Sequence, residues 1–75
     1  MPSTNAERAE RAAEVLVEYA QSQDLSREEA WEDLETVAVD LMTDLMHAAA
    51  FYHMDLDGIF RVSRLHFREE SAGRE

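Results

Sequence analysis

Hydrophobic positions along the chain recur at steps of three and four residues, which is the spacing of amphipathic helices. The pattern predicts three helices, over about residues 4–22, 27–53 and 56–69. Two glycines and one proline leave few places for the turns that a β-sheet needs. The chain is therefore predicted to be all-α, with a single helical domain over residues 1–70 and a frayed tail over residues 71–75.

Capping signals support the start of each predicted helix. Thr4 with Glu7, and Ser26 with Glu29, have the spacing of a capping box. In that motif a hydroxyl and a carboxylate three residues apart satisfy backbone N–H groups that have no partner inside the helix. Asp55 is the expected N-cap of the third helix.

The segment 27–53 carries the longest apolar stripe of the chain. Its apolar positions advance by alternating steps of three and four, as in helices that pack lengthwise; they are Trp31, Leu34, Ala38, Leu41, Leu45, Ala48 and Tyr52. A continuous helix over this segment would be about 40 Å long and would exceed both of its neighbours. We therefore expect part of the stripe to stay uncovered in a monomer and to be covered in a homodimer.

Charge divides the molecule into two unlike parts. Seventeen acidic residues and seven arginines, with no lysine, give a formal net charge of −10. Residues 1–57 hold 14 acids and three arginines (net −11), whereas residues 58–75 hold three acids and four arginines (net +1). Direct binding to nucleic acid is disfavoured, because affinity for phosphates comes from cationic contacts. The acidic part is either a solvated exterior or a surface for a basic partner.

The chain has no cysteine, which excludes disulfides and thiolate metal sites. Its first residues lead into charged positions without the apolar stretch of a secretory signal. The longest uncharged run, residues 45–54, is too short to cross a bilayer. The sequence therefore predicts a cytoplasmic protein that does not bind membranes.

Asp40, Asp44 and His47 form the most specific chemical group in the sequence. On one helix they share a face, and carboxylate with imidazole is a ligand set for divalent metal ions. That face points away from the apolar stripe, so nothing else in the chain is expected to complete a site. The alternative is a solvated face with a surface histidine. We expect no bound metal, no cofactor and no enzymatic activity.

A rival enzymatic hypothesis comes from the acidic residues of the second helix. Glu32 and Glu35 have the spacing E-x-x-E. This resembles the first half of the motif of MazG-type nucleotide pyrophosphohydrolases, in which two acidic helices hold Mg²⁺ against a triphosphate. The second half, E-x-x-D on the next helix, is absent, because Asp40 and Asp44 are four apart on the same helix. The resemblance implies a small metal-dependent all-α enzyme, and a metal-binding helical dimer is the related alternative.

The second half of the chain carries a pattern of Asp, Leu and His that consists of the run V-D-L-M-T-D-L-M-H over residues 39–47, then Leu56-Asp57 and His66-Phe67. Over residues 37–70 this resembles small uncharacterised helical proteins of phages and integrative mobile elements. Residues 62–64 depart from the small residues that the pattern has before its final histidine. The resemblance implies no reaction, but it implies a gene carried on a mobile element.

The function expected from these features is a non-enzymatic acidic protein-binding module. Its sharper form is a mobile-element inhibitor that occupies a basic nucleic-acid-binding groove of a host protein, as anti-CRISPR and other DNA-mimic proteins do. Two rows of carboxylates along about 25 Å of one helix could imitate phosphate spacing. The predicted partner-binding residues, which include two outward apolar side chains, are Glu28, Glu32, Asp33, Glu35, Asp40, Asp44, Met46 and Phe51. A basic stripe on the third helix, available for ion pairs within the protein or its dimer or for an acidic partner, comprises Arg61, Arg64 and Arg68.

Overall fold

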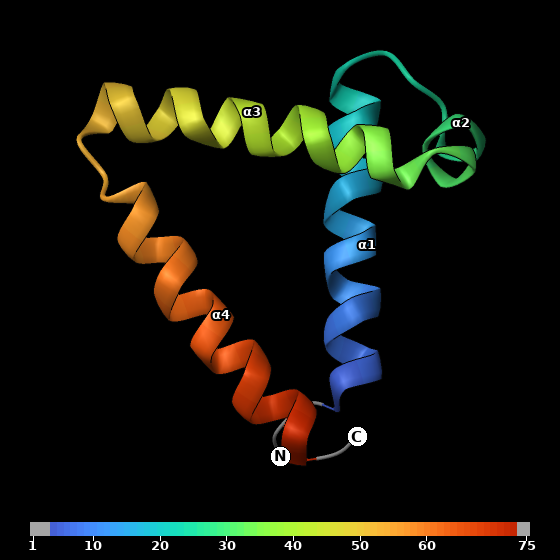
Figure 1. The fold of residues 1–75 in the computed structure, drawn as a ribbon. Coiled ribbons are helices and arrows are strands. Elements are labelled where there is room, and N and C mark those ends of the chain that lie inside the picture. The colour runs from blue at the N-terminus through green and yellow to red at the C-terminus, as the bar shows by residue number, and fades with distance from the viewer. Residues whose placement is uncertain (1–3, 74–75) are drawn as a thin grey trace.

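The computed structural model describes residues 4–73, which form four helices and no strand. The helices are α1 (Asn5–Ser22), α2 (Arg27–Glu32), α3 (Leu34–Tyr52) and α4 (Leu56–Gly73). α1 and α3 cross steeply, and α4 runs back from the end of α3 towards the start of α1, so that the three long helices form the sides of a triangle (Figure 1). The all-α prediction is confirmed.

The predicted capping boxes are present at the starts of α1 and α2. The Thr4 hydroxyl accepts a hydrogen bond from the Glu7 N–H at 3.1 Å, and the Glu7 carboxylate accepts one from the Thr4 N–H at 3.0 Å. Ser26 and Glu29 make the same reciprocal pair at 3.1 and 2.8 Å. Hydrogen bonds from Ser26 to the Glu29 carboxylate hold the pKa of Glu29 below its usual value, and the bond from the Ser26 backbone N–H has the largest effect.

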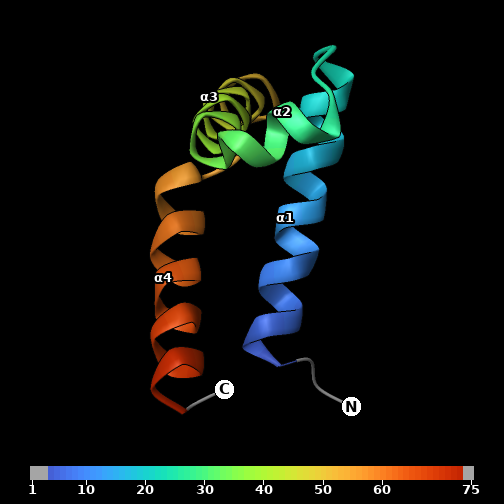
Figure 2. The same cartoon turned by 90° about the vertical axis from the view of Figure 1, so that its right-hand side faces the viewer.

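The expectation of one continuous helix over residues 27–53 was wrong, because the chain interrupts it at Asp33. Asp33 has φ −146° and ψ 61°, outside the helical region. Its carboxylate accepts hydrogen bonds from the Thr36 N–H at 3.2 Å and from the Thr36 hydroxyl at 2.8 Å. Aspartate side chains compete for nearby backbone donors and so favour a cap over a helix interior. The apolar periodicity continues through this residue, but the helix axis turns (Figure 2).

The ends of α3 and α4 can be compared with the predicted helix boundaries at residues 53, 56 and 69. α3 ends at Tyr52, followed by His53 in the left-handed conformation with φ 58°. Asp55 caps α4, since its Oδ1 accepts a hydrogen bond from the Gly58 N–H at 3.0 Å. α4 continues to Gly73, four residues beyond the predicted helix end at residue 69, and residues 74–75 lie outside the described part. No helix within residues 4–73 is long and apolar enough to cross a membrane.

The core is small and lies where α1, α2 and α3 meet. It consists of four buried residues, with three half-buried ones packed against them: Val17, Ala20, Ala30 and Val37, then Leu16, Tyr19 and Leu34. The predicted stripe is only partly buried, because Trp31 is 53% and Tyr52 is 70% exposed. The buried residues of α3 are Val37 and Ala49, at the edges of the stripe. The turn at Asp33 and the short crossing with α1 leave much of the stripe of α3 uncovered.

α4 is the least packed of the four helices. None of its residues is buried. Two polar contacts link it to the start of α1, and both lie near its C-terminal end. There the Glu70 carboxylate pairs with the Arg8 guanidinium at 2.7 Å, and the Glu70 carbonyl accepts from the Asn5 side chain at 3.2 Å. α4 is therefore tied down at its two ends and loosely covered between them.

Candidate partner-binding surface

The carboxylates predicted to bind a partner are all exposed, but they do not run along one straight helix. Glu28 and Glu32 lie on α2, whereas Glu35, Asp40 and Asp44 lie on α3. The axes of α2 and α3 point in different directions on the two sides of the turn at Asp33 (Figure 2). The straight double row expected from the sequence is therefore replaced by an acidic surface that bends around a corner.

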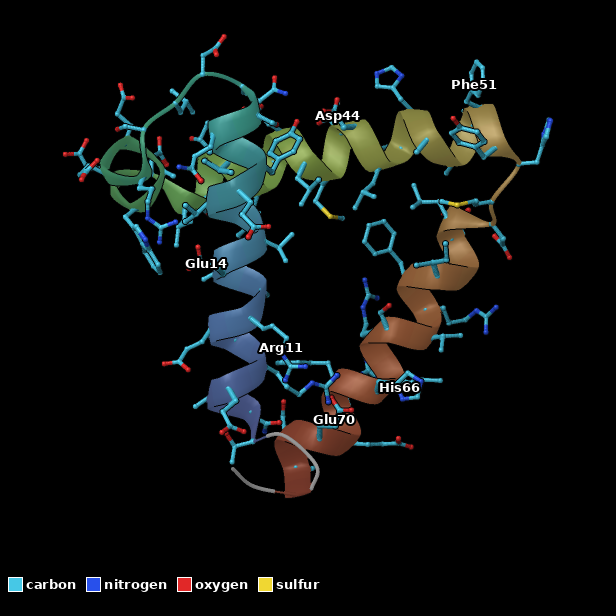
Figure 3. All side chains as sticks on the ribbon, turned by 180° about the vertical axis from the view of Figure 1, so that it is seen from behind. Arg11, Glu14, Asp44, Phe51, His66 and Glu70 are labelled. Carbon is cyan, nitrogen blue, oxygen red and sulfur yellow. The ribbon has the colours of Figure 1, made fainter. Side chains whose placement is uncertain are left out.

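Two of the predicted carboxylates already have partners inside the protein. Asp33 accepts the two donors of Thr36. Asp44 on α3 accepts a hydrogen bond from the Tyr19 hydroxyl on α1 (Figure 3). That hydrogen bond, with smaller effects of desolvation and of the negative charges of Asp44 and Asp40, raises the pKa of Tyr19 to about 12. Asp33 and Asp44 therefore hold the fold together, and they are less available to a partner.

The other four predicted carboxylates make no such contact inside the protein. They are Glu28, Glu32, Glu35 and Asp40. Within residues 4–73 none of the four side chains takes part in a hydrogen bond or an ion pair. The charge of Glu28 makes a small contribution to the raised pKa of Arg27. We call these four residues the acidic surface. Because their oxygens are exposed and form no ion pair, they are the predicted residues best placed to bind a cationic partner.

Sequence reasoning missed a charged contact that joins α1 to α2. The two guanidinium nitrogens of Arg27 contact the two carboxylate oxygens of Glu14 at 2.8 and 3.3 Å. This hydrogen-bonded pair holds the pKa of Glu14 below its usual value and raises that of Arg27. The two residues are 13 positions apart on separate helices, so no local spacing rule signals the pair. Arg27 is the arginine nearest in sequence to the acidic surface, and its guanidinium group contacts Glu14.

Met46 and Phe51 point outward, as the sequence predicted. Met46 is 56% exposed and Phe51 is 76% exposed. Phe51 meets the ring of Tyr52 edge to face, with centroids 5.1 Å apart. It projects from the end of α3, away from α4 (Figure 3). Phe51 lies in the last turn of α3 and Glu35 in the first, so the structure does not gather all the predicted contact residues into one patch.

The metal-binding group considered from the sequence is not assembled as a site. In the described part of the chain no three His, Cys, Asp or Glu side chains lie close enough to share a metal ion. Asp40, Asp44 and His47 are each exposed on α3, and Asp44 is engaged by Tyr19. The face that carries them is a polar helix surface.

The basic stripe of Arg61, Arg64 and Arg68 lies along one side of α4. With Phe60 and Leu65 it lines a shallow hollow of about 620 Å³. None of the three arginines forms an ion pair inside the chain as far as residues 4–73 show it. The intramolecular salt bridges that the sequence left open for this stripe are thus not found there, and the guanidinium groups face solvent.

No protein-family model, no curated protein and no solved structure matches this chain.

Proposed function

We propose that this chain is a non-enzymatic protein-binding module that uses its acidic surface to bind a basic protein. The observation that carries the proposal is the set of four exposed carboxylates that form no ion pair within residues 4–73. The rest of this part of the chain adds to the negative electrostatic potential around the four carboxylates, because residues 4–55 hold 13 acids and three arginines. A surface of one sign attracts a partner of the other sign and orients it during the encounter.

The partner class that fits this surface is a protein with a basic groove for nucleic acid. Carboxylates can replace phosphates as acceptors for arginine and lysine, since both form charge-assisted hydrogen bonds with these cations. The turn at Asp33 divides the acidic surface between two helices, with Glu28 and Glu32 on α2 and Glu35 and Asp40 on α3, and a surface spread over two helix directions suits a curved groove. In this narrower form the protein is an inhibitor that competes with nucleic acid, and a mobile element would carry its gene.

Capture from a lysate of cells that carry the gene tests the general proposal. The test variant replaces the acidic surface with amides of the same shape: Glu28→Gln, Glu32→Gln, Glu35→Gln and Asp40→Asn. The matched control makes the same change of net charge, from −10 to −6, at four other exposed acids: Glu10→Gln, Glu18→Gln, Asp57→Asn and Glu69→Gln. We expect the test variant to retain at least about tenfold less of a basic protein than the control.

Measurements at high salt and in competition with DNA show what kind of binding the capture reports. Binding that survives about 1 M salt, where the screening length is about 3 Å, argues against an electrostatic surface. Equal losses in the two variants show that total charge, and not the acidic surface, governs binding. Once a partner is identified, release of the chain by a DNA duplex supports the nucleic-acid mimic. Failure of the duplex to compete leaves a basic protein partner but rejects the mimic.

A further inference from the structure

The described triangle is far more open than a folded chain of this size normally is. Its radius of gyration is 14.1 Å, whereas a compact domain of 75 residues has a radius of about 11 Å. Its accessible surface is 6159 Å², whereas a compact monomer of 8.6 kDa exposes about 4,700 Å². The excess of about 1,500 Å² per chain is surface that a monomer of ordinary compactness would bury.

Much of the uncovered surface on α4 is apolar. Five large hydrophobic side chains on this helix are between 39% and 68% exposed: Ile59, Phe60, Val62, Leu65 and Phe67. The neighbouring half of α3 adds Leu45, at 40% exposed. Single exposed apolar residues are ordinary, but a helix with this many and with no buried residue is typical of an interface. Phe60 and Leu65 lie on the side of α4 that carries the three arginines, and Phe67 lies on the side towards α1. We call this set of six residues the α4 face.

Charge indicates what kind of molecule covers the α4 face. Over Leu56–Gly73 three acids and three arginines cancel, whereas residues 4–55 carry 10 more acids than arginines. α4 is therefore the element through which a second, equally acidic copy can approach with least repulsion. The three arginines beside the face are unpaired within residues 4–73, and a second copy supplies the carboxylates that would pair with them. A basic partner would instead be repelled by these arginines.

From these features we infer that the α4 face binds a second copy of this chain and forms a homodimer. In a two-fold dimer each copy contributes the same surface. Two chains that each bury their excess would cover about 3,000 Å², which lies in the range of obligate homodimers. Oligomerisation is also a usual source of stability for chains of this length without disulfides. This interface is separate from the acidic surface, so a dimer can still present carboxylates to a basic protein.

Sedimentation equilibrium on the full chain tests the dimer. We expect a mass of twice 8.6 kDa and a thermal midpoint that rises with protein concentration, because dissociation is coupled to unfolding. The interface variant is Leu65→Gln with Phe67→Gln, and the matched control is Phe51→Gln, which removes an equally exposed phenyl ring that points away from α4 (Figure 3). The interface variant should weaken the dimer at least about tenfold, and the control should leave it unchanged.

Reversal of the arginines gives a second readout. Arg61→Glu with Arg64→Glu and Arg68→Glu should also weaken the dimer at least about tenfold, because like charges then face each other across the interface. A wild-type chain that stays at 8.6 kDa up to a concentration of about 1 mM would overturn the inference. Its free energy of association would then be weaker than about 4 kcal/mol. Equal weakening by Phe51→Gln would overturn the assignment to α4. Neither result bears on the test variant of the capture experiment, which alters carboxylates of α2 and α3 only.

Discussion

Asp33 occupies a position that serves two helices at once. Its N–H donates to the Ala30 carbonyl at 3.3 Å and so closes α2, and its own carbonyl accepts from the Val37 N–H at 3.3 Å and so opens α3. Its carboxylate takes both donors of Thr36. One residue thus terminates one helix and caps the next, with no loop between them. The direction in which α3 leaves α2 is set at this residue.

Removing the cap should destabilise the fold. Asp33→Ala removes the acceptor for Thr36 and should lower the free energy of unfolding by about 1 kcal/mol, the usual cost of losing an N-cap. Asp33→Asn is the matched control, because asparagine caps about as well and keeps an acceptor oxygen. Urea denaturation of both variants gives the two values. If Asp33→Ala is more stable than the wild type, a continuous helix through residue 33 is favoured and the cap does not determine the turn.

At the scale of elements, α1 and α3 are held together by few contacts of small side chains. The core at their crossing is rich in alanine, which allows close approach but buries little apolar area. The hydrogen bond from Tyr19 to Asp44 lies beside this crossing and ties α1 to the middle of α3. Polar contacts between elements therefore carry more of the geometry here than they would in a larger core.

Tyrosine titration measures that contact directly. With Tyr52→Phe to leave one tyrosine, phenolate absorbance should give a pKa of about 12 for Tyr19, against the ordinary 10.0. A raised folded-state pKa means that the stability from this bond is complete below pH 10.0 and is lost as the pH rises through about 12.

Two carboxylate variants identify the cause. Asp44→Asn should lower the pKa of Tyr19 most of the way to 10.0, because the hydrogen bond to Asp44 is the largest contribution. Asp40→Asn should lower it only slightly, because Asp40 acts through its charge alone. Equal shifts in the two variants would show that general negative charge, and not the hydrogen bond, raises the pKa.

At the scale of the whole molecule, the triangle closes through Glu70. Its side chain meets Arg8 and its carbonyl meets Asn5, about one helix length from the turn that joins α3 to α4 (Figure 1). An exposed ion pair contributes at most about 1 kcal/mol. The angle between α4 and α1 is therefore weakly held, and this allows α4 to adjust to a second copy.

Electron-spin distance measurements test the closure. The chain has no cysteine, so Glu10→Cys with Glu69→Cys places two labels on α1 and α4, and dilution with unlabelled chain restricts the signal to distances within one chain. Arg8→Gln should broaden the distance distribution while changing the free energy of unfolding by less than about 1 kcal/mol. Glu18→Gln, which changes an exposed side chain of α1 that forms no ion pair, is the control. An unchanged distribution in Arg8→Gln would show that other contacts fix α4.

The sequence by itself determined the helical content, the first and second helix starts and the division of charge. These features depend on interactions within three or four residues, such as Thr4 with Glu7, or on a simple count of ionised groups. The turn at Asp33 also has a local signal in the Asp33–Thr36 spacing, but the prediction rested on the regular apolar stripe and did not use it. Periodicity reports which side of a segment is apolar and does not report whether the axis continues.

Only the tertiary structure decided which carboxylates are free. Asp44 is engaged by Tyr19 from 25 residues away, Glu14 by Arg27 from 13, and α4 is anchored to Asn5 from 65. Such contacts depend on how helices cross, and the crossing depends on the summed packing of all of them. For the same physical reason the openness of the triangle, with α4 uncovered, could not be inferred from the apolar pattern alone. The acidity was evident in the sequence, and its availability to a partner was set by the fold.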